Sequence, residues 1–370
     1  MTAGARPRVA IVHDYLTQRG GAERVVLALA AAFPEAAIHT SFYAPGETFP
    51  QFADLDVRTM AMNRVGFLRD HHRLALPVLA PAFSRLRVDA DVAVCSSTGW
   101  AHGANVSGRT VVYCHSPARW LWVKDQYLPP GSSLSKRAMI GALERPLRKW
   151  DVRAAGRADR YLVNSTLIRD RVEQAYGIEA EIVPPPFTLP VDGRQHPPIA
   201  DLEPGFFVCV SRLLPYKNVR QVVEAFSALP DQRLVVVGSG PDEAAVRSAA
   251  GANVAFTGTV GDEELAWLYS HAAGLVAASY EDFGITPLEA AAFGVPVAAL
   301  RWGGFLDTVR EGETGVFFDR PEAGPIRDAV ANLLGRSWDR AALAAHANTF
   351  SEERFVTRLR AVVDDELARP

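Results

Sequence analysis

Residues 206–229, FFVCVSRLLPYKNVRQVVEAFSAL, contain the pattern that recurs along most of this chain. A continuous apolar run, Phe206–Ser211, is followed by a polar loop and then by a helical segment, Asn218–Leu229. Continuous rather than alternating apolar runs are typical of parallel strands covered on both faces. The stretch therefore predicts one strand–loop–helix unit of a parallel sheet.

Short runs rich in Val and Ile predict further strands on both sides of this stretch. They lie at 8–13, 37–42, 91–96, 110–115 and 160–164 in the first half, and at 233–238, 254–258, 274–279, 296–300 and 315–318 in the second. Helical segments such as 262–272 and 287–293 separate most of them. Repeated units of this kind predict the α/β class, with doubly wound sheets.

A proline-rich stretch divides the chain, since prolines sustain neither a helix nor a central strand. It comprises Val183-Pro184-Pro185-Pro186 and the segment Leu189–Pro198. We therefore predict two Rossmann-like domains, 1–188 and 199–350. Two such domains facing one another would form a cleft lined by the carboxyl ends of their strands, where open α/β sheets bind ligands.

Composition and charge narrow the function classes. The 370 residues are 48% hydrophobic and 22% charged, an ordinary composition for a soluble protein, and the net charge of −3 argues against a nucleic-acid binder. The charge is uneven: residues 1–190 carry 23 Lys and Arg against 17 Asp and Glu, or +6, and the remainder −9. No apolar run reaches the roughly 20 residues that span a bilayer, and no signal-peptide core follows Met1. We predict a cytoplasmic protein, soluble or peripheral on the membrane.

The cysteines predict a reducing compartment. Cys95, Cys114 and Cys209 form an odd set without a CxxC pair, and all three lie in predicted strands. We expect all three to be buried thiols.

Two loops contain residues that could bind an anion. Gly20-Gly21-Ala22-Glu23-Arg24 follows the first strand and opens a helix, so it is either a plain tight turn or a phosphate or acceptor loop. Arg212 and Lys217, five residues apart after the strand at 206–211, are either a solvated basic loop or a pair of cations converging on one diphosphate.

The segment Glu281–Glu289, EDFGITPLE, also has two interpretations. Thr286-Pro287-Leu288-Glu289 reads as a capping box, which would give Glu289 a structural role. The same helix start could instead hold a phosphate on its amides and sugar hydroxyls on its carboxylates. No cap explains Glu281, and residue chemistry alone leaves both interpretations open.

The spacing of Glu281 and Glu289 resembles a known signature. Residues 281–296, EDFGITPLEAAAFGVP, resemble the E-x7-E motif of the retaining nucleotide-sugar glycosyltransferases of family 4. Further segments resemble that family in the same order along the chain: the glycine loop at 20–24, YCHSP at 113–117 with RWLW at 119–122 as in bacterial mannosyltransferase-like members, the basic loop at 211–218, and GSGP at 238–241. Ser239 and Trp302 depart from the residues common there.

The resemblance implies the GT-B fold and a role for each matching residue. Arg212 and Lys217 would bind the donor diphosphate, and Glu289 the ribose hydroxyls. Glu281 would contact the transferred hexose. The backbone at Phe283, Gly284 and Ile285 would contact the hexose hydroxyls, and the helix start at Thr286 would contact a phosphate. Val260 would lie near the nucleobase. From the first domain, His115 would reach the reacting centre, and Gly20 and Gly21 would approach the phosphate.

The resemblance further implies a metal-independent hexosyltransferase that retains anomeric configuration, with GDP-mannose the preferred donor. No His/Cys cluster has the spacing of metal ligands, which agrees with a reaction that needs no metal or cofactor. The amphipathic segment 351–370 is expected to pack back on the first domain, as the final helix often does in this family. Asp14, after the first strand, either caps a turn or contacts the acceptor.

Two basic stretches interleaved with apolar residues, Asn63–Val88 and Lys136–Arg160, are either solvated helix faces or a surface for an anionic membrane. Membrane docking would suit a lipid-linked or glycan acceptor. Two alternative functions remain: a non-catalytic nucleotide-sugar-binding subunit, and another GT-B enzyme such as an epimerase or phosphorylase.

Overall fold

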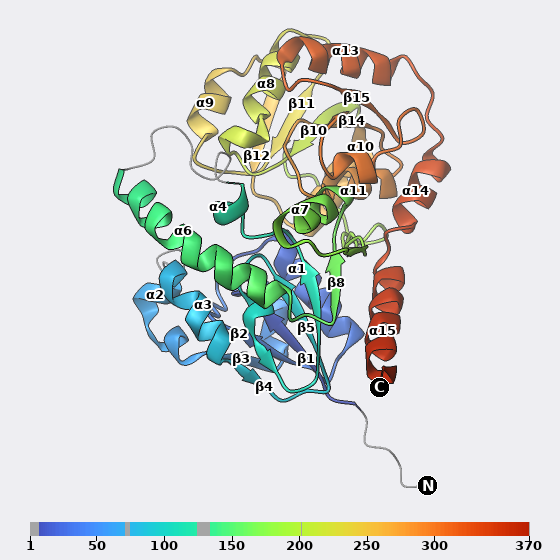
Figure 1. The fold of residues 1–370 in the computed structure, drawn as a ribbon. Coiled ribbons are helices and arrows are strands. Elements are labelled where there is room, and N and C mark those ends of the chain that lie inside the picture. The colour runs from blue at the N-terminus through green and yellow to red at the C-terminus, as the bar shows by residue number, and fades with distance from the viewer. Residues whose placement is uncertain (1–6, 71–74, 124–133, 201, 370) are drawn as a thin grey trace, which may run out of the picture. The chain divides into compact units, whose positions relative to one another are not determined.

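The computed structural model describes residues 7–70, 75–123, 134–200 and 202–369. It divides into two compact units, each built on its own parallel sheet (Figure 1). Unit 1 comprises residues 1–185 and 352–370, and unit 2 comprises residues 186–351. The chain first passes from one unit to the other between Pro185 and Pro186, inside the proline-rich stretch.

Unit 1 contains a seven-stranded sheet in the order β3-β2-β1-β5-β7-β8-β9, in which every pairing is parallel. Its strands are β1 (Val9–His13), β2 (Ala37–Thr40), β3 (Val57–Thr59), β5 (Val92–Ser97), β7 (Arg109–Cys114), β8 (Arg160–Val163) and β9 (Glu181–Ile182); β4 (Arg87–Val88) and β6 (Asn105–Val106) pair separately. Its α-helices are α1 (Gly21–Ala32), α2 (Gly66–Asp70), α3 (Leu76–Arg85), α4 (Arg119–Trp122), α6 (Leu134–Ala155), α7 (Thr166–Tyr176) and α15 (Glu352–Ala368).

Unit 2 contains a six-stranded parallel sheet in the order β12-β11-β10-β13-β14-β15. The strands are β10 (Phe206–Val210), β11 (Leu234–Val237), β12 (Val254–Gly258), β13 (Ala272–Ala277), β14 (Val297–Leu300) and β15 (Gly315–Phe318). The helices are α8 (Val219–Ser227), α9 (Glu243–Ser248), α10 (Asp262–His271), α11 (Thr286–Ala292), α12 (Phe305–Thr308), α13 (Ala323–Leu334) and α14 (Arg340–Asn348).

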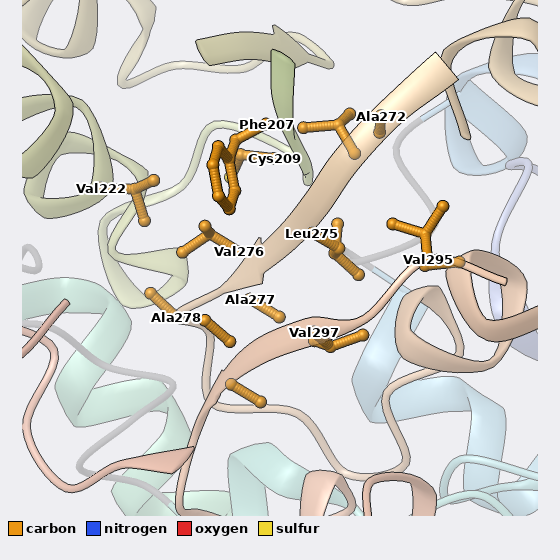
Figure 2. Packing of buried hydrophobic residues seen from close by; sticks show 14 of the residues in the cluster. Phe207, Cys209, Val222, Ala272, Leu275, Val276, Ala277, Ala278, Val295 and Val297 are labelled. Carbon is orange, nitrogen blue, oxygen red and sulfur yellow. The ribbon is translucent and has the colours of Figure 1, made fainter. Parts of the chain in front are cut away.

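Buried apolar residues cover both faces of each sheet, as continuous apolar strands require. In unit 1, Ile11 of β1 packs in a cluster with α1 and α15, whereas its neighbours Ala10 and Val12 pack in the cluster on the other face. In unit 2, Figure 2 shows side chains of β10 and β13, among them Phe207 and Val276, in one buried cluster. The α/β class and the doubly wound sheets are therefore as predicted.

The predicted strands are all present, with ends that differ by at most a few residues. The prediction omitted β3 and β9 at the edges of the first sheet, which are three and two residues long. All three cysteines are free and buried, as expected. Burial raises the pKa of the Cys95 and Cys209 thiols to about 12, so both stay protonated at neutral pH.

The C-terminal helix α15 belongs to unit 1 and packs against α1 (Figure 1). Its buried side chains recur at helical spacing and include Phe355, Leu359 and Val363. The ring of Phe355 meets that of Tyr113 of β7 edge-on, with centroids 5.7 Å apart. Outside this apolar stripe, Arg360 donates from Nε to the carbonyl of Ala32 at the end of α1, at 2.9 Å.

The strand order reverses once in each sheet, between β1 and β5 and between β10 and β13. Chains leaving adjacent strands at such a point turn to opposite faces, which leaves the carboxyl ends of both strands open to a ligand. The loops after β1, β5, β10 and β13 are therefore the places to look for a site.

Asp14, directly after β1, holds the reversal point of unit 1 together. Its buried carboxylate accepts hydrogen bonds from Thr98, which donates from N at 2.6 Å and from Oγ1 at 2.5 Å, and from the amides of Trp100 (3.1 Å) and Ala101 (2.6 Å). All these donors lie in the loop after β5. Of the two roles open to Asp14, the structure assigns it the capping of this turn.

We expect Asp14→Ala to destabilise the protein by at least about 3 kcal/mol, because four donors, two of them buried and two partly buried, lose a charged acceptor. Asp14→Asn keeps one acceptor oxygen and should lose less. The measurement is urea denaturation followed by circular dichroism. Glu35→Ala removes an exposed carboxylate of the same unit and should stay within about 0.5 kcal/mol of the wild type. Equal urea midpoints for Asp14→Ala and Glu35→Ala would show that Asp14 does not hold the loop after β5 in place.

Candidate active site

The loop after β10 carries the two predicted cations. Pro215–Lys217 form a short 3₁₀ turn, and Asn218 follows in the left-handed region at φ 55°. The side-chain amide of Asn218 donates to the carbonyl of Ala278 at 2.8 Å, which ties this loop to the end of β13. The two loops at the reversal point of unit 2 are thus held next to each other.

Lys217 and Glu281 meet across these two loops. The ammonium of Lys217 forms an ion pair with Oε1 of Glu281, and the hydroxyl of Ser279 donates to the same oxygen at 2.9 Å. Lys217 is 8% exposed, whereas the Glu281 side chain retains 28%. The pair therefore fixes a nearly buried cation at the strand end while leaving part of the carboxylate accessible.

Arg212, the second cation of this loop, is exposed. Within the described part of the chain, its guanidinium has no hydrogen bond or ion pair, so its donors are available to a ligand. A planar fork of free donors beside a compact ammonium suits a diphosphate.

The loop after Glu281 is shaped by two close approaches. Gly284 has φ +80°, and a Cβ there would lie 2.5 Å from the ring of Phe305. A Cβ at Gly304 would lie 2.2 Å from the backbone of Phe283, and the Gly304 amide donates to the carbonyl of Glu281 at 3.0 Å. The backbone that leads into α11 is therefore held in place by the loop after β14.

The capping box predicted at Thr286-Pro287-Leu288-Glu289 is wrong. Ile285 occupies the N-cap position with helical dihedrals (φ −76°, ψ −31°) and makes no side-chain cap. Thr286 is thus already inside the helix, and Glu289 lies one position beyond the site from which it could reach back to a cap. Its amide instead donates to the carbonyl of Ile285 in an ordinary helical bond of 3.1 Å.

Glu289 is buried at 6% exposure and accepts a hydrogen bond from the hydroxyl of Tyr269 at 3.2 Å. Burial, and next the carboxylate of Glu289, raise the pKa of Tyr269 well above its usual value, so Tyr269 remains a donor. The carboxylate is therefore oriented by a fixed partner from α10. Sequence reasoning did not identify Tyr269 or Ser279.

Val260, expected near a nucleobase, lies two residues beyond β12 and is half-buried against the core of unit 2. Nearby, the hydroxyls of Ser239 and Thr259 are 3.1 Å apart. Ser239, which stands where an acidic residue is common in the family it resembles, thus joins the loops after β11 and β12.

In unit 1, His115 follows β7 and is joined to two other polar residues. Its Nε2 lies 2.8 Å from the Ser96 hydroxyl, and Nδ1 of His13 lies 3.1 Å from that same hydroxyl and 3.1 Å from the Ser96 carbonyl. Burial, followed by the nearby His13 and Arg119, lowers the pKa of His115 to about 3, so its imidazole is neutral at physiological pH.

The glycine loop before α1 encloses a second buried carboxylate. A Cβ at Gly20 would lie 2.5 Å from Oε2 of Glu23, whereas a Cβ at Gly21 would meet nothing within 4 Å. A side chain at Gly20 would displace the carboxylate of Glu23 from its present position, and the anion-binding role predicted for the loop stays a prediction. Burial raises the pKa of Glu23, and its Oε2, like Nε2 of His13, has no hydrogen-bond partner among the described residues.

The predicted residues thus fall into two sets, one in each unit. Arg212, Lys217, Glu281, Glu289, Val260 and the segment 283–286 lie in unit 2, and His115, Gly20 and Gly21 in unit 1. The described residues contain no group of three or more His, Cys, Asp or Glu arranged to hold a metal ion. No helix in the described ranges is both long and apolar enough to cross a bilayer.

Comparison with known protein families agrees with this two-part organisation. Residues 19–189 match the model for Glycosyltransferase Family 4, and residues 195–349 match the model for Glycosyl transferases group 1. The D-inositol 3-phosphate glycosyltransferase of Mycobacterium tuberculosis (strain ATCC 25618 / H37Rv) is 38% identical over 164 residues, which are 39% of this chain and 34% of that protein. The match therefore spans about a third of the length of that relative.

Solved structures show the same fold over almost the whole chain. The sucrose-phosphate synthase of Thermosynechococcus elongatus superposes with a TM-score of 0.66 at 20% identity, covering 98% of this chain and 99% of that one. Anabaena HepE in complex with UDP-glucose gives 0.69 at 18% identity, covering 96% and 99%. The predicted GT-B class is confirmed. The chain therefore consists of a domain of Glycosyltransferase Family 4 followed by a domain of the Glycosyl transferases group 1 family, in the GT-B fold.

Proposed function

We propose that this protein is a retaining glycosyltransferase that moves a hexose from a nucleotide-sugar to a lipid-linked or glycan acceptor in bacterial surface-glycan synthesis. The observation that carries the proposal is the group formed by Arg212, Lys217 and Glu281 at the reversal point of unit 2. It places two cations and one accessible carboxylate where an open α/β sheet binds its ligand.

The two cations suit the leaving group of such a transfer. Negative charge grows on the departing diphosphate as the bond to the sugar breaks, so cations aimed at it bind the transition state more tightly than the ground state. Lys217 is already held by Glu281, which Ser279 orients, so the ammonium needs little reorganisation during the reaction. Arg212 and Lys217 would perform the neutralisation that a divalent ion performs elsewhere, and we propose that the reaction needs no metal.

The remaining residues of unit 2 would hold the other parts of the donor. Glu289, oriented by Tyr269, would accept the ribose hydroxyls, and Val260 would lie near the nucleobase. Glu281 and the backbone at 283–285 would contact the hexose, with the start of α11 at Thr286 close to the phosphate. His115 of unit 1 would contact the sugar at the reacting centre, and Gly20 and Gly21 the phosphate.

The identity of the donor is the most specific part of the proposal. Mannose from GDP-mannose is the first candidate, because YCHSP at 113–117 resembles mannosyltransferase-like members. Anabaena HepE, which shares the fold, was solved with UDP-glucose. A donor panel that contains both nucleotides, with the anomeric configuration of the product followed by NMR, decides between them and tests retention. An epimerase would convert the donor without transfer, and a non-catalytic subunit would bind it without turnover.

We expect Lys217→Ala and Arg212→Ala each to lower turnover about tenfold or more, because each removes a cation that stabilises the leaving diphosphate. The readout is nucleotide release with and without acceptor, in the presence and absence of a chelator. Arg220→Ala is the matched control, since Arg220 is exposed and pairs with Glu224 on α8. Near-wild-type turnover in both site variants would disprove the assignment, and full inhibition by the chelator would contradict metal independence.

We also propose that unit 1 docks on an anionic membrane from the cytoplasmic side. The basic stretches meet at α3 and α6, where a groove of about 530 Å³ is lined largely by apolar side chains, with Arg85 and Trp150 at its sides. Phe67 of α2 is 62% exposed, and Arg64, Arg87, Lys149 and Arg153 are exposed as well. His71, His72 and Arg73 of the first stretch lie outside the described residues, and the side chains of Lys136 and Arg137 are likewise not described.

We expect the protein to sediment with vesicles that contain phosphatidylglycerol but not with pure phosphatidylcholine vesicles, and to be released as salt is raised. Arg85→Glu combined with Lys149→Glu should abolish this binding. Arg327→Glu combined with Arg336→Glu makes the same charge change on exposed residues of unit 2 and should leave binding unchanged. Binding that is insensitive to salt, or equal loss in both double variants, would contradict docking through unit 1.

A further inference from the structure

Three polar residues at neighbouring strand ends of unit 1 lie on one face of the sheet. His13 of β1 pairs in register with Ser96 of β5, and Ser96 pairs with Tyr113 of β7. His115 lies two residues beyond Tyr113, so strand alternation returns it to the same face. The ring nitrogens and the hydroxyl that meet there are those of His13, Ser96 and His115, all buried.

The Ser96 carbonyl determines which groups donate and which accept in this set of hydrogen bonds. A carbonyl oxygen only accepts, and it lies 3.1 Å from Nδ1 of His13. Nδ1 of His13 therefore carries a proton and cannot accept one from the Ser96 hydroxyl, which lies at the same distance.

The Ser96 hydroxyl then has one acceptor left. It is fully buried, and among the described residues its polar neighbours are His13, which donates to it, and Nε2 of His115 at 2.8 Å. A buried hydroxyl without an acceptor is costly, so its proton points to Nε2 of His115. Nε2 must be the unprotonated nitrogen of that ring.

A neutral imidazole that accepts at Nε2 carries its proton at Nδ1. The ring is neutral at physiological pH, because burial and the neighbouring His13 and Arg119 keep the pKa of His115 low. Nδ1 of His115 has no hydrogen-bond partner in the described part of the chain. It is also not one of the fully buried side-chain atoms that lack a partner there, so it remains accessible to a ligand.

We propose that Ser96 is a positioning residue which, held by His13, fixes His115 as the Nδ1–H tautomer. His115 then presents an N–H donor to an oxygen of the bound sugar or phosphate. It does not act as a general base, because its basic nitrogen faces Ser96. The proton of the acceptor hydroxyl must leave by another group, for which the departing phosphate is the chemically suited acceptor. The consequence for turnover rests on the proposed glycosyl transfer, whereas the tautomer itself does not.

The test uses the full chain labelled with ¹⁵N-histidine, without substrate, at neutral pH. Long-range ¹H–¹⁵N correlation spectra separate protonated from unprotonated ring nitrogens, and His115→Gln identifies the His115 signals among those of the nine histidines. We expect a protonated Nδ1 and an unprotonated Nε2 at His115. A proton on Nε2 in the wild type overturns the proposal.

Ser96→Ala should release His115 into a mixture of tautomers, and Ser96→Thr, which keeps the hydroxyl, should restore the single form. Ser97→Ala is the matched control: its hydroxyl lies 2.8 Å from Nδ1 of His102, so it should shift His102 and leave His115 unchanged. An unchanged His115 tautomer in Ser96→Ala contradicts the role of Ser96.

For turnover, we expect Ser96→Ala to lower kcat about tenfold, with kcat restored in Ser96→Thr and unaffected in Ser97→Ala. A wild-type kcat in Ser96→Ala, together with a changed tautomer, would overturn the functional part of the inference. Absence of any transfer by the wild type would contradict the proposed function instead, and the spectra would still decide the tautomer.

Discussion

The reversal of strand order in each sheet is the constraint on which the candidate site depends. Because β1 and β5, and likewise β10 and β13, send their chains to opposite faces, the loops between them have no helix to close over them. Polar and charged residues can therefore gather at the strand ends without filling the core. The predicted site residues of unit 1, and the ion pair of unit 2, lie in the loops at or beside these points.

The two units hold their reversal points together by different interactions. Unit 1 uses a buried carboxylate, Asp14, whose oxygens are both occupied by donors of the loop after β5. Unit 2 uses the Asn218 amide on the carbonyl of Ala278 and the ion pair of Lys217 with Glu281. The first arrangement is a closed structural clamp, whereas the second keeps one carboxylate partly accessible and leaves Arg212 without a partner among the described residues. This difference favours unit 2 as the place where an anionic ligand is bound.

Much of the fold was predictable because buried parallel strands read as continuous apolar runs, whereas β3 and β9 are too short to give that signal. The pairing of Lys217 with Glu281 follows once β10 and β13 are known to be neighbours, because both residues lie in the loops after these strands. The capping-box interpretation of Glu289 was wrong because it depends on the dihedrals of Ile285, which the sequence does not show. The His13–Ser96–His115 chain was not predicted, because His13 and Ser96 are 83 residues apart and only register brings them together.

The charge asymmetry of the two sequence halves is largely kept when the residues are divided by unit instead. With α15 included, unit 1 carries 27 Lys and Arg against 22 Asp and Glu, and unit 2 carries 12 against 20. Unit 2 at −8 would repel a diphosphate at long range, but solvent ions screen exposed charges beyond about 10 Å at moderate salt. The proposed binding there would then depend on the local set of Arg212, Lys217 and Glu281, whose sum is one positive charge. The exposed guanidinium of Arg212 and the fixed ammonium of Lys217 would supply that attraction at contact distance, where screening is weakest.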